Sequence, residues 1–288
     1  MFDQEITPFL NNYLETLDKS KISKALKYSI KGGKCIRGFI VKHILETVNP
    51  SNLSWEPIVA VELIQAASLI IDDLPSMDND AMRRGKPSTF KMFGEHESIL
   101  TSFFMVSESL RIMNTRIFEL TESNTESKIA IKSLIDEWCS LLGRNLVVGQ
   151  MIDLKSDCED MFNIKLSNKQ DVNDTLIKYK TCSLFSFAFI LGALFANKNL
   201  DVEEFKQMGY FFGLMFQLMD DFKDKETDEV FANYILAKGE AKAREKYTEA
   251  RTSLLVLLAK NNLLTDKFKE LVNLIDGRFI NKPILETN

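Results

Sequence analysis

Two short acidic clusters hold the residues most able to do chemistry in this sequence. Each contains three aspartates after a long apolar run: Asp72, Asp73 and Asp78 in the first, and Asp220, Asp221 and Asp224 in the second. Neighbouring carboxylates repel one another, so a cation is expected among them. For the first cluster, a surface salt bridge to Arg83 or Arg84 is one explanation, and a bound metal ion is the other.

The side chains that are scarce narrow the chemistry further. The chain has only two histidines, His43 and His96, and no glycine-rich phosphate loop. This argues against a Ser-His-Asp relay and against a histidine-rich metal centre. Two carboxylate pairs instead suit a hard ion with oxygen ligands, and Mg²⁺ prefers a shell completed by water and substrate phosphates. We therefore predict a site for Mg²⁺ and a diphosphate.

Basic residues near the two clusters complete such a site: Lys34, Arg37, Arg83, Arg84 and Lys180. Each of them taken singly is explained as well by a solvated surface charge, but the whole set beside two acidic clusters is not. Because no nucleophile or base dyad is present, the metal would act as a Lewis acid on a leaving diphosphate. Apolar helices would then shield the resulting allylic carbocation from water.

The elements that must position these residues are predicted to be helices. No proline occurs between Pro87 and Pro283, which favours helices, and β-hairpin patterns with Asn-Gly or Asp-Gly turns are missing. Apolar periodicity predicts four long helices: Pro57–Ile71, Ser127–Leu154, Leu184–Ala196 and Phe205–Asp224. We predict an all-α fold, with one domain over residues 1–288 built as a helical bundle around a deep central cavity. Residues 248–288 would form peripheral helices.

Composition excludes several classes of protein. The net charge of −5 argues against a nucleic-acid binder. The longest apolar run, Leu184–Ala196, is too short to cross a bilayer, and the amino terminus does not have the pattern of a signal sequence. The cysteines are scattered and indicate reduced thiols, which predicts a cytoplasmic protein. These cysteines are Cys35, Cys139, Cys158 and Cys182.

Five motifs, in order, resemble those of the trans-isoprenyl diphosphate synthases, the family of farnesyl and geranylgeranyl diphosphate synthases. They are "GGKCIRG", "DDLPSMDNDAMRRGKPS", "VVGQMIDL", "YKTCSLF" and "FQLMDDFKD", and the resemblance covers about residues 25–247. It implies an isoprenoid synthase-like bundle that condenses isopentenyl diphosphate with an allylic diphosphate (dimethylallyl, geranyl or farnesyl). It also implies three Mg²⁺ ions when substrate is bound, and a homodimer.

The resemblance assigns roles to the matching residues. Metal ligands would be Asp72, Asp78 and Asp220, supported by Asp73, Asp221 and Asp224. The allylic diphosphate would be held by Arg83, Lys180, Thr181 and Gln217, and isopentenyl diphosphate by Lys34, Arg37 and Arg84. The catalytic set is then Asp72, Asp73, Asp78, Asp220, Asp221 and Lys180. In this family the released diphosphate is thought to remove the final proton, so no protein base is needed.

This sequence departs from the family pattern at four places. Gln65 replaces the usual histidine of the isopentenyl diphosphate site, and an amide donates a hydrogen bond but carries no charge. Cys35 takes a position often held by arginine. The Gly-Lys loop after the second cluster is short, and Thr101–Phe103 replaces a stretch of small residues.

Product length in this family depends on the side chains beneath the first cluster. The fifth and fourth residues before Asp72 are Ala67 and Ser68, where farnesyl synthases usually carry an aromatic residue. One isoprene unit extends about one helical turn, roughly 5 Å, so small residues there predict a geranylgeranyl product. Ala67→Phe is expected to shift the product toward farnesyl diphosphate. Two explanations stay open for three residues further along the chain: they form a deeper floor of the product cavity, or they simply pack in the core. These residues are Phe103, Phe104 and Met105.

Three other functions stay open on the sequence. One is a farnesyl or longer-chain synthase. Another is a non-catalytic subunit of a heteromeric prenyl synthase, motivated by Gln65 and the short loop, although such subunits tend to lose one acidic cluster. The third is a terpene cyclase, which shares the helical fold, but the second cluster "DDFKD" differs from the Asn/Ser/Glu triad of that class.

Overall fold

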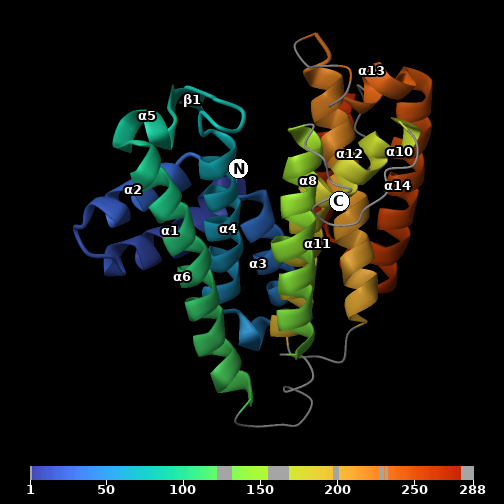
Figure 1. The fold of residues 1–288 in the computed structure, drawn as a ribbon. Helices are drawn as coiled ribbons and strands as arrows, with labels where there is room; N and C mark the ends of the chain where they lie inside the picture. Colours follow the sequence, from blue (N-terminus) through green and yellow to red (C-terminus); the bar gives the residue numbers. More distant parts are fainter. Residues whose placement is uncertain are drawn as a thin grey trace. The chain divides into compact units, whose positions relative to one another are not determined.

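The computed structural model describes residues 2–121, 132–154, 169–196, 201–226, 230 and 233–279. The chain divides into two compact units (Figure 1). The first unit contains Met1–Ser133 and Leu191–Asn199, and the second contains Leu134–Ile190 and Leu200–Asn288.

The first unit is helical apart from one very short hairpin. Its elements are α1 (Phe2–Thr16), α2 (Lys21–Ile30), α3 (Ile36–Val48), the 3-10 turn η1 (Pro50–Asn52), α4 (Glu56–Asp72), β1 (Met82–Arg83), β2 (Lys86–Pro87), α5 (Thr89–Phe93) and α6 (Glu95–Thr121). Within the described residues these two strands are the whole of the sheet structure, so the predicted all-α class is confirmed.

The second unit is built from helices that include two π-helical segments. Its elements are η2 (Trp138–Asn145), α8 (Leu146–Asp153), α10 (Lys169–Leu176), η3 (Ile177–Cys182), α11 (Ser183–Phe195), α12 (Val202–Lys223), α13 (Tyr234–Lys238), α14 (Glu240–Lys260) and α15 (Asp266–Phe279). The last residues of α11 belong to the first unit. The helix predicted over Ser127–Leu154 is confirmed over residues 132–153, with the π-helical segment η2 within it, and its first residues lie outside the described residues.

Helices α4 and α6 lie side by side in the first unit (Figure 1). Residues 56–67 of α4 are buried except for Gln65, which explains the nearly continuous apolar run. The face of α6 that is turned inward carries small side chains, including Thr101 and Ser102, which let the two helices approach closely. The hydroxyl of Ser102 donates a hydrogen bond to the carbonyl of Ala67 at 3.0 Å. This contact fixes α6 against the part of α4 that precedes the first acidic cluster.

The apolar run that sequence placed at Leu184–Ala196 belongs to a longer helical stretch. Because α10, η3 and α11 follow one another without a break, Val172–Phe195 is long and apolar enough to cross a membrane by length and composition. In its most apolar window, however, 78% of the residues are buried inside the protein. Such burial is typical of a core helix and agrees with the prediction that no segment spans a membrane.

The carboxyl-terminal helices α14 and α15 each have one buried and one exposed face. Helix α14 packs on α12, with Tyr247 fully buried. The hydroxyl of Tyr247 donates to the Asp276 carboxylate of α15 at 2.8 Å, and Arg251 also donates to that carboxylate at 2.9 Å. These bonds tie α15 to α14 in the second unit. Residues 280–288 of the predicted peripheral segment lie outside the described residues.

Candidate active site

The first acidic cluster lies where α4 ends. Asp72 is the last residue of the helix and is half-buried, whereas Asp73 caps the helix and is 2% exposed. The chain then turns back on itself, because the backbone N–H of Asp78 donates to the carbonyl of Asp72 at 2.9 Å. The two predicted metal ligands Asp72 and Asp78 are thus brought together by a backbone hydrogen bond, with Asp78 exposed.

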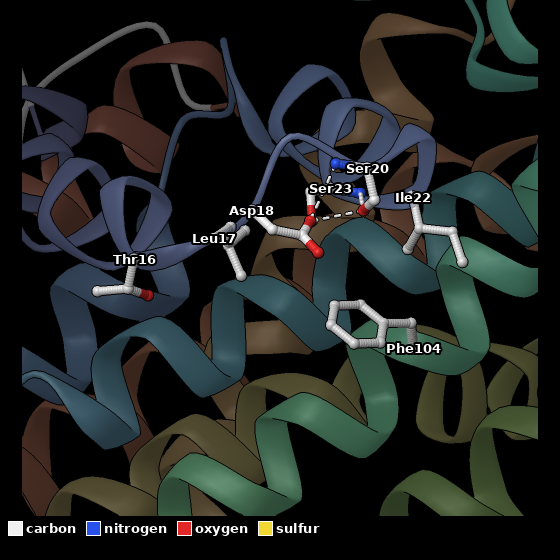
Figure 2. A pocket seen from close by; sticks show the side chains of 7 residues that line it. All are labelled: Thr16, Leu17, Asp18, Ser20, Ile22, Ser23 and Phe104. Atoms are coloured by element: carbon white, nitrogen blue, oxygen red, sulfur yellow. Dashed lines mark hydrogen bonds between the residues drawn. The ribbon is translucent and has the colours of Figure 1, made fainter.

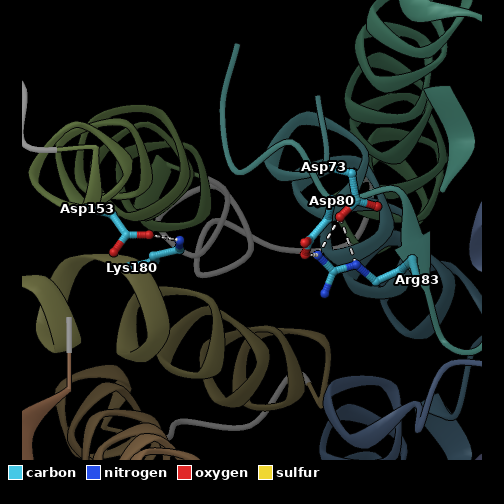
Figure 3. Close-up of polar contacts among 5 residues, drawn as sticks. All are labelled: Asp73, Asp80, Arg83, Asp153 and Lys180. Atoms are coloured by element: carbon cyan, nitrogen blue, oxygen red, sulfur yellow. Dashed lines mark hydrogen bonds and ion pairs between the residues drawn. The ribbon is translucent and has the colours of Figure 1, made fainter. Parts of the chain in front are cut away.

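Arg83 forms an ion-pair network with this cluster (Figure 3). Its guanidinium donates to Asp73 Oδ1 through both Nε, at 2.8 Å, and Nη2, and Nη2 also donates to Asp80 at 2.9 Å. Burial raises the pKa of Asp73, although the Arg83 guanidinium acts to lower it. A salt bridge to Arg83 therefore accounts for Asp73 and Asp80. Metal binding by Asp72 and Asp78 stays a prediction.

The hairpin β1–β2 positions both arginines of the first motif. Arg83 pairs with Lys86, so Arg84 and Gly85 form a two-residue turn. Both have positive φ angles, 54° and 74°, as a type I′ turn requires, which explains the glycine after the arginines. The hairpin has strands of two residues and an Arg-Gly turn, so it does not carry the alternating Asn-Gly or Asp-Gly pattern whose absence favoured an all-α fold.

Arg84 is brought onto the end of α2, just before the "GGKCIRG" motif. Its Nη1 donates to the carbonyls of Ser29, Ile30 and Lys31 at 3.2, 3.4 and 3.4 Å. Nearby, Lys86 Nζ donates to the carbonyl of Tyr28 at 2.6 Å. Three residues predicted to hold isopentenyl diphosphate, Lys34, Arg37 and Arg84, therefore belong to one region of the first unit.

The second acidic cluster lies at the end of α12, and its first two aspartates repeat the burial pattern of Asp72 and Asp73. Asp220 and Asp224 are half-buried, whereas Asp221 is 2% exposed. One carboxylate oxygen of Asp221 accepts from Gln217 Nε2 at 2.7 Å, and the other accepts from the backbone N–H of Tyr234 at 2.8 Å. The carboxylate of Asp221 thus holds the start of α13 onto α12.

Asn233 strengthens the same connection. Its Nδ2 donates to the carbonyl of Asp221 at 2.7 Å, and its Oδ1 caps α13 by accepting from the N–H groups of Ile235 and Leu236 at 3.0 and 3.2 Å. Sequence analysis gave Asn233 no role. The short loop before it falls partly on residues 227–229, 231 and 232, which lie outside the described residues.

Lys180 and Thr181 lie within the π-helical segment η3. Segments of this kind are rare and recur at functional sites. The hydroxyl of Thr181 donates to Gln217 Oε1 at 2.5 Å, which links η3 through Gln217 to Asp221. Three of the predicted site residues in the second unit, Thr181, Gln217 and Asp221, are therefore joined in one hydrogen-bonded chain.

Lys180 forms an ion pair with Asp153 at the end of α8 (Figure 3). Helix α8 approaches η3 closely because residue 149 is a glycine: a Cβ there would lie 2.6 Å from the backbone nitrogen of Lys180. Gly149 and Asp153 belong to the "VVGQMIDL" motif, but the sequence analysis assigned them no roles. They are four residues apart and so share one helix face, and this spacing was the sequence signal for a contact with Lys180.

The aspartates of both clusters offer carboxylate oxygens, which are the donor atoms that a hard divalent ion prefers. Among the described residues, no group of three or more His, Cys, Asp or Glu side chains is arranged to hold a metal by itself. The half-buried donors Asp72 and Asp220 are carboxylates, which suit Mg²⁺ when substrate oxygens complete its shell. Magnesium binding, the number of ions and the union of the two clusters in one site stay predictions.

The residues predicted to set product length lie on different faces. Ser68 is half-buried and shares the helix face of Asp72, four residues on. Ala67 is buried beneath Ser102 of α6. Met105 is fully buried, but Phe103 is 69% exposed, so a floor that includes Phe103 is wrong. Phe103 points outward because α6 turns its small residues, not this side chain, toward α4.

A hollow of about 360 Å³ lies between the α1–α2 turn and α6 (Figure 2). The described residues that line it are Thr16, Leu17, Asp18, Ser20, Ile22, Ser23 and Phe104. None of the predicted metal or diphosphate residues is among them. Phe104 therefore borders this surface hollow.

Three comparisons with known proteins agree with this geometry. The farnesyl diphosphate synthase of Bacillus subtilis is 30% identical over 281 residues, which cover 96% of this chain and 90% of that protein. Geranylgeranyl pyrophosphate synthase 4 of Arabidopsis thaliana is 30% identical over 80% of this chain and 63% of its own length. The solved geranyltranstransferase of Thermotoga maritima matches with a TM-score of 0.75 and 26% identity, over 95% of this chain and 97% of that one.

The structural match confirms the predicted isoprenoid synthase-like fold. The sequence model of the polyprenyl synthetase family matches residues 19–279, which is most of the chain and includes every motif named above. The resemblance found in the motifs is thereby confirmed. This chain belongs to the polyprenyl synthetase family, with farnesyl and geranylgeranyl diphosphate synthases among its relatives.

Proposed function

We propose that this chain is an active, Mg²⁺-dependent prenyl elongase that condenses isopentenyl diphosphate with an allylic diphosphate and releases mainly geranylgeranyl diphosphate. Membership of the polyprenyl synthetase family supports the reaction class. The allylic substrates would be the dimethylallyl, geranyl and farnesyl diphosphates. Assembly into a homodimer stays a prediction.

The observation that carries the proposal is the shared exposure of Asp72 and Asp220. Each is the first aspartate of a motif and is half-buried, whereas the aspartate that follows it is only 2% exposed. Asp72 and Asp220, with Asp78, would hold Mg²⁺. When bound, that ion supplies Lewis-acid stabilisation of the departing diphosphate.

The cations of the proposed allylic site are oriented by the protein itself. Arg83 is held by Asp73 and Asp80, and Lys180 by Asp153. Such partners fix the direction of long side chains that would otherwise lose conformational entropy on binding. A diphosphate would then add charge-assisted hydrogen bonds to cations that are already oriented.

Product length rests on Ser68 more than on Ala67. Ser68 lies one turn before Asp72 on the same face and is partly accessible, so its small side chain leaves room along that face. Ala67 is covered by α6, and a bulky residue there would first push against Ser102. Overpacking of this kind destabilises a core by about 1–3 kcal/mol. The geranylgeranyl product is therefore proposed mainly on Ser68.

The direct test incubates the pure protein with labelled isopentenyl diphosphate, farnesyl diphosphate and Mg²⁺. Chromatography of the dephosphorylated prenols then gives the product length. A C20 alcohol supports the proposal. Extension of geranyl but not farnesyl diphosphate would replace it with a farnesyl synthase, which the name of the Bacillus subtilis relative favours. No label in prenols from any allylic substrate would favour the non-catalytic subunit that Gln65 suggests.

Ser68→Phe sharpens the assignment of product length. An aromatic ring on the Asp72 face would block growth, so the product should shift from C20 to C15. Ser68→Ala keeps the position small and serves as the matched control, with an unchanged C20 product. A C20 product from Ser68→Phe at the wild-type rate would contradict the role given to this residue.

A further inference from the structure

Glu62 is a buried carboxylate of the first unit that the proposed reaction does not use. It lies on α4, three residues before Gln65 and ten before Asp72, and is 5% exposed. Burying a carboxylate is unfavourable unless hydrogen bonds or opposite charges compensate it. The groups around Glu62 should therefore supply hydrogen bonds or opposite charges that compensate its burial.

The carboxylate of Glu62 caps a different helix. The first turn of α3 has backbone N–H groups without partners inside the helix, and they carry partial positive charge. Cys35, at the N-cap position, has a left-handed conformation and makes no side-chain capping bond in the part of the chain that the structure describes. The N–H of Gly38, in this first turn, instead donates to Glu62 Oε1 at 2.7 Å.

Gly38 is what allows this contact. A Cβ at residue 38 would lie 3.1 Å from Cγ of Glu62 and 3.1 Å from Cγ2 of Ile6, which is closer than most real Cβ contacts. A larger residue would therefore push Glu62 away from the helix end. The last glycine of "GGKCIRG" and the glutamate of α4 act as a matched pair.

Two of the proposed substrate-binding arginines also act on Glu62. Burial raises the pKa of Glu62, while the Gly38 N–H, Arg37 and Arg84 act to lower it. Arg37 is in the first turn of α3, and Arg84 rests on the carbonyls of residues 29–31 just before the loop. Glu62 therefore interacts electrostatically with both of these arginines, in addition to its hydrogen bond with Gly38.

We propose that Glu62 is a positioning residue for isopentenyl diphosphate: by capping α3 and balancing Arg37 and Arg84, it fixes the loop that carries Lys34. It does not itself touch the substrate. This inference rests on the proposed function, because that function assigns the three basic residues to isopentenyl diphosphate. It predicts that Glu62 affects one diphosphate site and not the other.

The test compares the kinetics of Glu62→Ala and Glu62→Gln with those of wild type. For Glu62→Ala, KM for isopentenyl diphosphate should rise about tenfold or more, as expected for losing a hydrogen bond to a charged group. KM for farnesyl diphosphate should change less than about twofold, because Glu62 is not expected to position the residues of the allylic site. Glu62→Gln keeps an acceptor for the Gly38 N–H and should recover part of the loss.

Glu56→Ala is the matched control. Glu56 is also a buried glutamate of α4, 8% exposed, but it lies in the first turn of that helix. Its removal should leave the ratio of the two KM values as in wild type. If Glu62→Ala raises both KM values equally, or neither, the positioning role is overturned. If Glu62→Ala does not fold, Glu62→Gln and Gly38→Ala carry the test, and both should show the same selective rise.

A binding experiment separates this inference from the proposed function. Calorimetry with isopentenyl diphosphate measures affinity without turnover. Should wild type bind it but make no prenol, weaker binding by Glu62→Ala and unchanged binding by Glu56→Ala would still support the role of Glu62. If wild type shows no affinity for isopentenyl diphosphate, or if Glu62→Ala binds it as tightly as wild type, the role of Glu62 is overturned.

Discussion

The two aspartate pairs are alike in burial and different in their partners. In each pair the first aspartate, Asp72 or Asp220, is half-buried, and the second, Asp73 or Asp221, is 2% exposed. Asp73 is neutralised by a cation, Arg83. Asp221 instead accepts hydrogen bonds from neutral groups, the amide of Gln217 and the backbone N–H of Tyr234.

This difference shows that adjacent acidic residues do separate work. The second aspartate of each pair anchors the segment that follows its helix: Asp73 holds the hairpin through Arg83, and Asp221 holds α13. The first aspartate is the more accessible of the two. A charged anchor is sensitive to salt, whereas a neutral anchor depends on hydrogen-bond geometry.

The largest expected effect follows from replacing the first aspartates. Asp72→Asn and Asp220→Asn should each lower kcat at least about a hundredfold, because Lewis-acid stabilisation is worth several kcal/mol and each 1.4 kcal/mol is about tenfold. Both residues are half-buried, so thermal unfolding should change little. Steady-state kinetics with Mg²⁺ measures the effect. A kcat within a few-fold of wild type for either variant would show that the first aspartates of the two pairs do not have equivalent roles.

A smaller effect is expected on stability from the second aspartates. Asp221→Asn should lower the free energy of unfolding by about 1–3 kcal/mol, because asparagine cannot accept at both positions and leaves a buried donor unsatisfied. Asp73→Asn should lower it less, since Arg83 uses only Oδ1 of Asp73 and also bonds Asp80. Urea denaturation of the two variants measures both values.

Salt distinguishes the two anchors. The loss caused by Asp73→Asn should shrink at high ionic strength, because salt weakens the ion pair of the wild type. The loss caused by Asp221→Asn should stay constant. If both losses respond to salt equally, the distinction between a charged and a neutral anchor is refuted.

The smallest effect concerns pH and Glu62, a buried carboxylate of helix α4. Its pKa is raised by burial, against Arg37 and Arg84, so the native state binds the proton more tightly than the unfolded state. The stabilisation from this proton is complete below the unfolded pKa of about 4.3 and is lost as pH rises. Cys35 nearby stays a neutral thiol, because burial raises its pKa to about 12.

Glu62→Gln does not titrate, so its free energy of unfolding relative to wild type should increase from about pH 4.5 to about pH 7. Urea denaturation at the two pH values measures the change. A difference that does not vary with pH would show that Glu62 titrates alike in the folded and unfolded chain. The Glu56→Gln variant provides the control on the same helix.

Sequence by itself determined the main helices and the two helix ends that carry the acidic clusters. The apolar runs before Asp72 and Asp220 predicted α4 and α12 to within a few residues, because helix periodicity is a local property of the chain. The motif order also identified the family before any geometry was known. These features depend on residues near one another in sequence.

Only the tertiary structure decided which aspartate of each pair is buried and what it binds. The π-helical turn that carries Lys180, its partner Asp153, the outward face of Phe103 and the bond from Gly38 to Glu62 all join or orient segments far apart in the chain. Burial and hydrogen-bond partners arise from packing between distant segments, and no local pattern of residues records them.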